Sequence, residues 1–207
     1  MPWEKQFDVD AALGKAMEAF WARGYAATSL RDLVDCMGIR RGSLYATYGD
    51  KRALFIAALR KYEREHRAGL FRALEDLDSP LDAIRGLFQA QVDKVAGEDA
   101  HVGCFLTNTA LELAPHDAEI GRIVADSQRR IEDFLARMIA AGRTAGEIPA
   151  GRPARALAQA LLASLMGMLV LSRSRPEQSL LQTIADDTVA RLSAAPPAYP
   201  TTTTTTH

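Results

Sequence analysis

The segment whose residue types most clearly suggest a chemistry is 39–52, which is rich in cations and hydroxyl groups. It contains Arg40, Arg41, Lys51 and Arg52 against one acidic residue, Asp50. The hydroxyl groups are those of Ser43, Tyr45, Thr47 and Tyr48. Guanidinium groups can bind guanine edges in the major groove, whereas hydroxyl and ammonium groups mostly bind phosphates. This composition favours binding to double-stranded DNA, and an acidic protein surface is the alternative partner.

Two short predicted helices position this segment. Ser29 can cap the first helix, and Asp32, three residues later, completes a short capping box. Apolar residues then recur at helical spacing, at Leu30, Leu33, Val34 and Met37. Gly38 can end this helix in a left-handed conformation, and Asp50 can cap a further helix. Two short helices joined by a glycine-containing turn make a helix-turn-helix, with Leu44 facing inward and the cations outward.

The sequence of this region resembles the N-terminal domain of TetR-type (tetracycline-repressor-like) transcriptional regulators. The resemblance rests on Gly24-Tyr25, Thr28-Ser29-Leu30-Arg31-Asp32-Leu33, Met37-Gly38-Ile39, Gly42-Ser43-Leu44-Tyr45, Tyr48-Gly49-Asp50-Lys51 and Leu54. Tyr48 stands where phenylalanine is more usual in that family. The resemblance implies a DNA-binding regulator rather than an enzyme, most often a repressor. It further implies a homodimer that binds a palindromic operator and is released by a small-molecule effector of unknown identity, with no cofactor.

The resemblance also implies which residues contact DNA. Arg40 and Arg41, with Arg31 from the preceding helix, are the candidates for contacts to base edges. The other candidates for DNA contacts are Thr28, Ser29, Gly42, Ser43, Tyr45, Thr47, Tyr48 and Lys51. Some family members use a basic N-terminal arm in the minor groove. Here Lys5 is the only cation before residue 8, so we expect no essential contact from an arm.

Periodicity and resemblance together predict an all-α protein with two domains. The expected helices cover residues 8–23, the two of the helix-turn-helix, 51–74, 80–95, 103–114, 117–143, 153–174 and a last segment that ends near 192. We assign residues 1–65 to the DNA-binding domain, with a connecting helix at 51–74, and residues 78–194 to an effector-binding and dimerisation domain. Residues 195–207, rich in proline and threonine, are expected to be a disordered tail.

The bulk composition is that of a soluble globular protein. The chain has 207 residues, 48% of them hydrophobic, and a formal net charge of −1. Two isolated cysteines, Cys36 and Cys104, argue against a disulfide framework or a zinc finger and favour a reducing compartment. The N-terminus lacks a secretory signal, and the longest apolar run, Leu161 to Leu171, is too short to span a bilayer. We therefore expect a cytoplasmic protein with no membrane partner.

The helix expected at 153–174 is apolar on nearly every side and therefore has to be covered on every side. We expect the last two helices to pair with their copies across a two-fold axis as a four-helix bundle. The alternative is that this helix is simply central to its own monomer. The candidates for the dimer interface are Leu161, Leu165, Met168, Leu169, Leu181 and Ile184.

Polar but uncharged side chains on otherwise apolar helices suggest a ligand pocket in the second half. The candidates for the effector pocket are Phe88, Gln91, Cys104, Thr107, Asn108 and Leu111. These polar groups could equally be buried and satisfied by backbone or water. The sequence contains no HExxH, GxSxG, P-loop or GxGxxG motif. Glu112, His116 and Asp117 fit a solvated helix junction better than a metal site, because Pro115 breaks the helix between them.

Cys104 has a second possible role. It lies near a helix start and three residues after His101, and both features can lower the pKa of a thiol. Its surroundings resemble a segment of TetR-type members, some of which sense electrophiles or oxidants through cysteine. Redox or electrophile sensing at Cys104 is therefore an alternative, and a small packing residue beside the pocket is the other. A helical enzyme that uses Asn108 and Cys104 is a more distant alternative, as is an interaction module that does not bind DNA.

Overall fold

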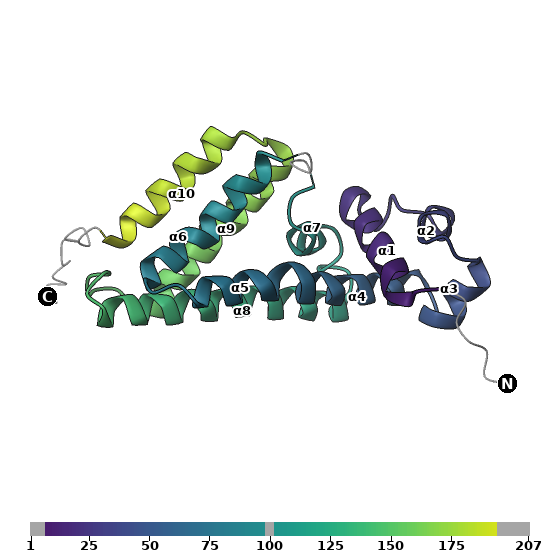
Figure 1. The fold of residues 1–207 in the computed structure, drawn as a ribbon, viewed down its shortest axis with the longest axis horizontal. Helices are drawn as coiled ribbons and strands as arrows, with labels where there is room; N and C mark the ends of the chain where they lie inside the picture. The colour runs from purple at the N-terminus through teal and green to yellow at the C-terminus, as the bar shows by residue number, and fades with distance from the viewer. Residues whose placement is uncertain (1–6, 98–101, 194–207) are drawn as a thin grey trace, which may run out of the picture.

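The structure, a computed structural model, describes residues 7–97 and 102–193, and these residues form helices joined by loops (Figure 1). The helices are α1 (Val9–Arg23), α2 (Leu30–Met37), α3 (Arg41–Tyr48), α4 (Lys51–Tyr62), the π-helix η1 (Glu63–Arg67), α5 (Ala68–Glu75), α6 (Pro80–Val95), α7 (Phe105–Glu112), α8 (Ala118–Thr144), α9 (Ala154–Ser174) and α10 (Gln178–Ser193). The expected all-α class is confirmed. The expected tail at 195–207, Lys5 and His101 lie outside the described residues.

Helices α1 to α3 gather with the start of α4 at one end of the molecule (Figure 1). The local signals work as expected, because Ser29 and Asp32 form a reciprocal capping box and Gly38 ends α2 with a φ of 68°. Phe20 of α1 is fully buried, and its ring meets that of Phe55 of α4 edge to face, with centroids 4.9 Å apart. This aromatic contact holds α1 against α4, and α2 and α3 lie beside this pair.

The expected connecting helix at 51–74 is not one continuous α-helix. A single π-helical turn at Glu63–Arg67 separates α4 from α5, although the three segments follow one line in Figure 1. The turn places Glu63 and Arg67 side by side against Ser127 of α8. The Ser127 hydroxyl donates to Glu63 at 2.6 Å, and Arg67 donates to Glu63 at 3.2 Å and to Ser127. A helical periodicity alone does not distinguish a π turn from an α turn, so the sequence could not predict it.

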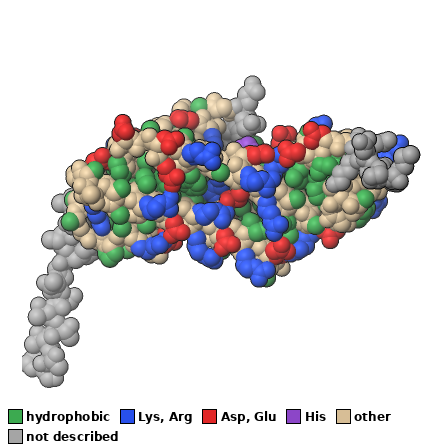
Figure 2. All heavy atoms as spheres, turned by 60° about the horizontal axis from the view of Figure 1, so that its bottom comes forward, with side chains coloured by type: hydrophobic (Ala, Val, Ile, Leu, Met, Phe, Trp, Pro, Cys, Tyr) green, Lys and Arg blue, Asp and Glu red, His purple; other side chains and the backbone are tan. Residues whose placement is uncertain are grey.

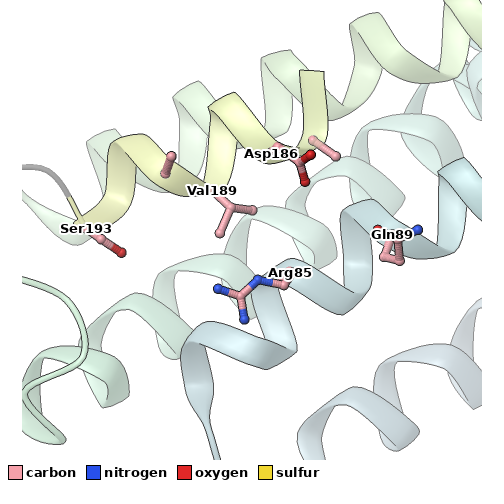
Figure 3. A pocket seen from close by; sticks show the side chains of 7 residues that line it. Arg85, Gln89, Asp186, Val189 and Ser193 are labelled. Atoms are coloured by element: carbon pink, nitrogen blue, oxygen red, sulfur yellow. The ribbon is translucent and has the colours of Figure 1, made fainter. Parts of the chain in front are cut away.

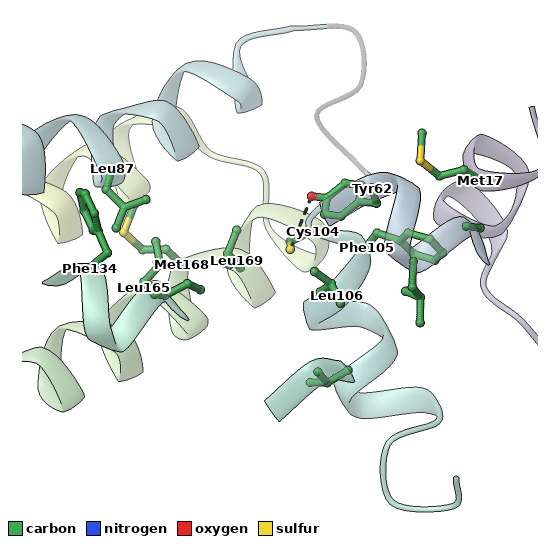
Figure 4. Packing of buried hydrophobic residues seen from close by; sticks show 14 of the residues in the cluster. Met17, Tyr62, Leu87, Cys104, Phe105, Leu106, Phe134, Leu165, Met168 and Leu169 are labelled. Carbon is green, nitrogen blue, oxygen red and sulfur yellow. Dashed lines mark hydrogen bonds between the residues drawn. The ribbon is translucent and has the colours of Figure 1, made fainter. Parts of the chain in front are cut away.

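The larger part of the molecule is built from α5 to α10. Helix α8 runs beside α4 and α5, while α6, α9 and α10 stack over its far end (Figure 1). Phe88, Phe134, Ile131, Leu165 and Met168 are buried where these helices meet, and several of them are drawn in Figure 4. The assignment of residues 1–65 and 78–194 to two domains stays a prediction.

Charged side chains of both signs alternate along the face that carries α4, α5 and α8 (Figure 2). Several of them form ion pairs between helices, such as Arg137 with Glu75 and Arg60 with Glu119. This face therefore presents no large area of a single charge, and it is a poor match for a polyanion.

Helix α9 is long and apolar enough to cross a membrane by length and composition, with a mean hydropathy of 1.7 over its best window. The sequence-based argument that its apolar run is too short is therefore corrected. Core helices of soluble proteins pass the same test, but only 28% of that window is buried within this chain. Part of the apolar surface of α9 is thus uncovered in the monomer.

The uncovered face of α9 is not the one that the sequence suggested. Of the six candidates for the dimer interface, Leu161, Leu165, Met168, Leu169 and Leu181 are buried inside the monomer, and Ile184 is half-buried. The five buried side chains pack against α6, α8 and their neighbours. The expectation that these five side chains form the dimer interface is therefore corrected. The exposed apolar residues of α9, together with its exposed glycine, are Ala160, Ala163, Gly167 and Val170, which recur at helical spacing on one face. The other exposed residues of α9 are polar, namely Arg155, Gln159, Arg173 and Ser174.

Candidate nucleic-acid interface and regulatory cavity

Helix α3 presents one polar face to solvent and is anchored by the other. Leu44 is fully buried, and the Tyr48 hydroxyl donates to the carbonyl oxygen of Val9 at 3.3 Å. On the outer side, the Arg41 guanidinium donates to the Tyr45 hydroxyl at 3.4 Å and lies 5.7 Å from the centre of that ring. Arg40, Arg41 and Tyr45 are exposed, so the helix offers cationic and hydroxyl groups to a partner.

Helix α2 adds an exposed cation near α3. The Arg31 side chain is 91% exposed, and its ion pair with Asp35 is a long one of 3.7 Å. Ser29, in contrast, uses its hydroxyl inside the capping box, where it donates to Asp32 at 2.7 Å. These hydrogen bonds hold the pKa of Asp32 below its ordinary value and fix the start of α2. Arg31 therefore remains available for a DNA contact.

Two of the predicted DNA contacts are occupied inside the protein. Thr28 is fully buried and its hydroxyl donates to the carbonyl oxygen of Gly24 at 2.6 Å, so its expected contact with DNA is wrong. The Lys51 ammonium donates to the carbonyl oxygen of Tyr25 at 2.6 Å and lies 4.3 Å from the centre of the Tyr25 ring. Partial burial lowers the pKa of Lys51. Its contact with a phosphate stays a prediction, as do those of Gly42, Ser43, Thr47 and Tyr48.

Arg52 belongs to an ion-pair network between α4 and α8 rather than to the α3 face. It donates two hydrogen bonds to Asp117, at 2.6 and 2.8 Å, and one to Glu119 at 3.0 Å. The hydrogen bonds from Arg52 hold the pKa of Asp117 well below its ordinary value. The same Asp117 carboxylate caps α8. The pair joins the start of α4 to the start of α8.

Helix α7 is bound to the DNA-binding end at both of its termini. At its C-terminal end, the Glu112 carboxylate accepts hydrogen bonds from the backbone nitrogens of Tyr25 at 3.1 Å and Ala26 at 2.8 Å. Just before its first turn, the carbonyl oxygen of Gly103 accepts a hydrogen bond from the Trp21 indole at 3.0 Å. Both oxygens of the Glu112 carboxylate are thus engaged with backbone donors, and among the described residues no group of three metal-ligating side chains occurs. No pattern in the sequence predicts this contact.

A small cavity of about 10 Å³ lies between η1, α7, α8 and α9. It is lined by Arg67, Leu106, Thr107, Val124, Ser127, Gln128, Ile131 and Met166. A volume of this size holds about one water molecule. The cavity is mostly apolar, with one guanidinium and a few uncharged polar groups, and α7 forms one of its walls.

Comparison with known proteins settles the family. Residues 12–58 match the model for bacterial regulatory proteins of the tetR family, and residues 80–186 match the model for the tetracyclin repressor-like C-terminal domain. The chain belongs to the tetR family. It is a helix-turn-helix transcriptional regulator, so the alternatives of an enzyme and of a module that does not bind DNA are set aside.

Relatives within the tetR family match along most of their length. The HTH-type transcriptional regulator YezE of Bacillus subtilis is 33% identical over 88% of this chain and 94% of its own. The HTH-type transcriptional repressor ComR of Escherichia coli is 33% identical over 89% of each chain. A solved structure of the TetR-family regulator CifR with a 26-base-pair double-strand operator DNA is 26% identical, with a TM-score of 0.80, over 90% of this chain and 97% of that one.

The pocket residues expected from the uncharged polar side chains on apolar helices are only partly brought together. Thr107 lines the cavity, whereas Phe88 and Gln91 are buried in α6, where the Gln91 amide donates to the carbonyl oxygen of Leu87 at 3.3 Å. Asn108 donates to the carbonyl oxygen of Val102 at 2.9 Å. Leu111 is 70% exposed, so its expected place in the pocket is wrong. The residues that the sequence missed are Arg67, Leu106, Val124, Ser127, Gln128, Ile131 and Met166.

Cys104 lies just before α7 and is only 6% exposed. The Tyr62 hydroxyl donates to its sulfur at 3.6 Å, as the dashed line in Figure 4 shows. Burial alone raises the pKa of the thiol, but Arg67 and hydrogen bonds from Thr107 and Tyr62 oppose it and bring the pKa below its ordinary value. The neighbours of the thiol thus oppose the effect of burial on its pKa, while the thiol itself is shielded from solvent.

A second hollow lies far from α3, between α6 and α10 (Figure 3). It has a volume of about 220 Å³, and its polar side chains include Arg85, Gln89 and Asp186. Arg85 is already paired with Asp82. The residues that line this hollow belong to α6 and α10, so it does not adjoin α7 or the connecting helix.

Proposed function

We propose that this protein is a cytoplasmic repressor whose homodimer binds a palindromic operator and is released by a small-molecule effector. The observation that carries DNA binding is the outer face of α3, where Arg40, Arg41 and Tyr45 are exposed while Leu44 holds the helix to its domain. Arg31 at the start of α2 extends this surface. In a symmetric dimer the two α3 helices enter successive major grooves, roughly 34–36 Å apart or a multiple of that distance.

The proposed dimer contact is the exposed face of α9, together with α10. Its residues are small, and a Cβ added to Gly167 would meet no atom within 4 Å in the monomer. Small side chains allow two helices to approach closely, and a second copy of the chain would cover the apolar surface that α9 leaves open. The packing of α9 on α8, α6 and α10 supports a rigid surface for this contact.

The proposed route of effector release runs through α7. This helix forms a wall of the cavity with Leu106 and Thr107, and it holds the DNA-binding end through Glu112. A cavity that holds about one water molecule must open to admit an effector. Movement of α7 away from the cavity would shift the loop that contains Tyr25 and Ala26. An effector that binds the shifted form more tightly lowers the affinity for the operator by the same coupling free energy.

The experiment that tests DNA binding is selection of bound sequences from a random DNA pool, followed by a salt titration on the best sequence. We expect a palindromic motif and an affinity that falls steeply with salt concentration. The double variant Arg40→Ala, Arg41→Ala should lose the motif, whereas Arg85→Ala, on α6, should keep it. Enrichment of no motif by the wild-type protein would contradict the proposal.

Covalent sensing at Cys104 is the second candidate for the release step, and the lowered pKa of its thiol favours it. Burial of the thiol means that a reagent would have to reach it through an opening beside α7. Treatment with an alkylating reagent separates the two candidates. Covalent sensing predicts that the reagent releases operator DNA from the wild-type protein but not from Cys104→Ser. Reversible binding predicts that both proteins respond alike.

A further inference from the structure

The outermost residues of α3 are its two smallest, Gly42 and Ala46. Successive residues of an α-helix are rotated by about 100° around its axis. Leu44 is fully buried and Tyr48 bonds to α1, so these two residues define the inward direction of α3. Ala46 then points almost directly away from the protein, and Gly42 lies one turn before it on the same line. Both residues are exposed.

Folding of the monomer does not require such small residues here. A Cβ added to Gly42 would meet no atom within 4 Å, and the φ of Gly42 is not positive. Ala46 faces solvent and packs against no core residue. A larger polar side chain would fit both positions in the free protein. Small residues along the outer face of α3 instead allow the helix backbone to lie close to the floor of the major groove.

The side chains beside this line are polar. Tyr45 is 41% exposed and is held to Arg41, and Ser43 is half-buried on the other side. Ala46 is therefore the apolar group at the centre of a polar surface. An alanine side chain cannot exchange hydrogen bonds with a base. The base-edge group in the major groove that it matches is the 5-methyl group of thymine.

We propose that Ala46 is a specificity-determining residue, and that its methyl group packs against the 5-methyl group of a thymine in each operator half-site. This inference rests on the proposed binding of α3 in the major groove. Gly42 brings the helix close enough for the contact, while Arg41 and Tyr45 on the adjacent side are free for hydrogen bonds.

The test uses the full-length protein and its selected operator, with each thymidine replaced in turn by deoxyuridine, which lacks only the 5-methyl group. We expect one position in each half-site to respond. Loss of one buried methyl contact should weaken binding about fourfold per half-site and about sixteenfold when both half-sites are changed. Replacement at the other positions should change the affinity little.

Variants of Ala46 assign the effect to this residue. Ala46→Gly should bind thymidine DNA more weakly and should not lose further affinity on the deoxyuridine DNA. Ala46→Ser, which keeps a Cβ in the helix, should also lose most of the preference for thymidine. Ala140→Gly, the same change at an exposed position of α8, should keep the full preference of the wild-type protein.

Several outcomes would overturn the inference. One is that no thymidine of the selected operator responds to replacement by deoxyuridine. Another is an Ala46→Gly protein that still distinguishes thymidine from deoxyuridine as the wild type does. Both leave the proposed operator binding intact. Failure of the wild-type protein to select any sequence would instead remove the proposed function, and the inference with it.

Discussion

The carboxylate of Glu112 lies 2.8 Å from the backbone nitrogen of Ala26, although 86 residues separate the two in sequence. The other carboxylate oxygen lies 3.1 Å from the backbone nitrogen of Tyr25. The turn before them contains Gly24, whose φ is 86° and whose missing Cβ would come within 2.9 Å of the Glu112 carboxylate. One side chain from the effector half thus caps the backbone that leads into the helix-turn-helix, and a glycine makes room for it.

Replacement of Glu112 by glutamine should weaken this connection. The glutamine amide can accept only one of the two hydrogen bonds and brings an N–H group against the other donor. Hydrogen bonds to a charged group contribute more than neutral ones, and we expect the free energy of unfolding to fall by about 1–3 kcal/mol. Chemical denaturation measures this change. Glu18→Gln, at an exposed position of α1, is the matched control and should change stability little.

The same variant tests the route of effector release. Glu112→Gln should keep a motif in DNA selection, because the α3 face is unchanged, but an effector should release its operator less completely than that of the wild type. Unchanged release by the same effector would show that the coupling does not pass through Glu112.

The Arg52–Asp117 pair should make stability depend on pH in acid. The pKa of Asp117 is lower in the folded protein than in the unfolded chain, because Arg52 donates two hydrogen bonds to its carboxylate. The stabilisation is therefore complete above the ordinary pKa of aspartate, about 3.9, and is lost as the pH falls toward the depressed folded value. Thermal unfolding at a series of pH values from about 2 to 6, which lie on both sides of the ordinary pKa of aspartate, measures this loss.

Asp117→Asn isolates the charge in this experiment. Asparagine can still cap α8, so the helix start is kept while the ion pair is lost. We expect the variant to be less stable at neutral pH and to show a shallower loss of stability in acid. Asp187→Asn, in an exposed ion pair of α10, should retain the steep acid dependence of the wild type. Parallel curves for Asp117→Asn and the wild type would contradict the assignment.

The helix-turn-helix was predictable because its signals are local. The capping box joins residues three apart, Gly38 adopts the left-handed conformation that its position suggested, and Leu44 is the inward residue of α3. Such features depend on the few residues around them and on little else. The error at Thr28 has the opposite cause, because its burial depends on the path of the chain from α1, and its hydroxyl bonds back to Gly24.

The cavity and the proposed dimer face were not predictable in the same way, because they depend on how helices rotate against distant partners. Helix α7 has only eight residues, and of its two leucines Leu106 is buried whereas Leu111 is exposed. Helix α9 is apolar nearly all round, so its sequence does not indicate which side faces the core. Large side chains such as Leu165 fill the core of the monomer, and the small ones such as Gly167 remain outside.

Replacement of Arg41 by alanine should reduce both affinity and specificity if its guanidinium reads a base. We expect a loss of about 1–3 kcal/mol on the selected operator and a relaxed motif in a repeated selection. A phosphate contact would instead weaken binding to all sequences equally and reduce the slope of the salt dependence. Titrations of operator and random DNA with Arg41→Ala therefore distinguish the two roles.

A glutamate at Gly167 should separate the dimer without unfolding the monomer. A Cβ added there meets no atom within 4 Å in the single chain, but in the proposed dimer the glutamate places a charge in an apolar helix contact. We expect Gly167→Glu to sediment as a monomer and to bind a full palindrome no better than a half-site. Gly69→Glu, at an exposed position of α5 that is equally open, is the matched control and should remain dimeric. A dimeric Gly167→Glu protein would exclude this face of α9 from the interface and would direct the search to the outer face of α10.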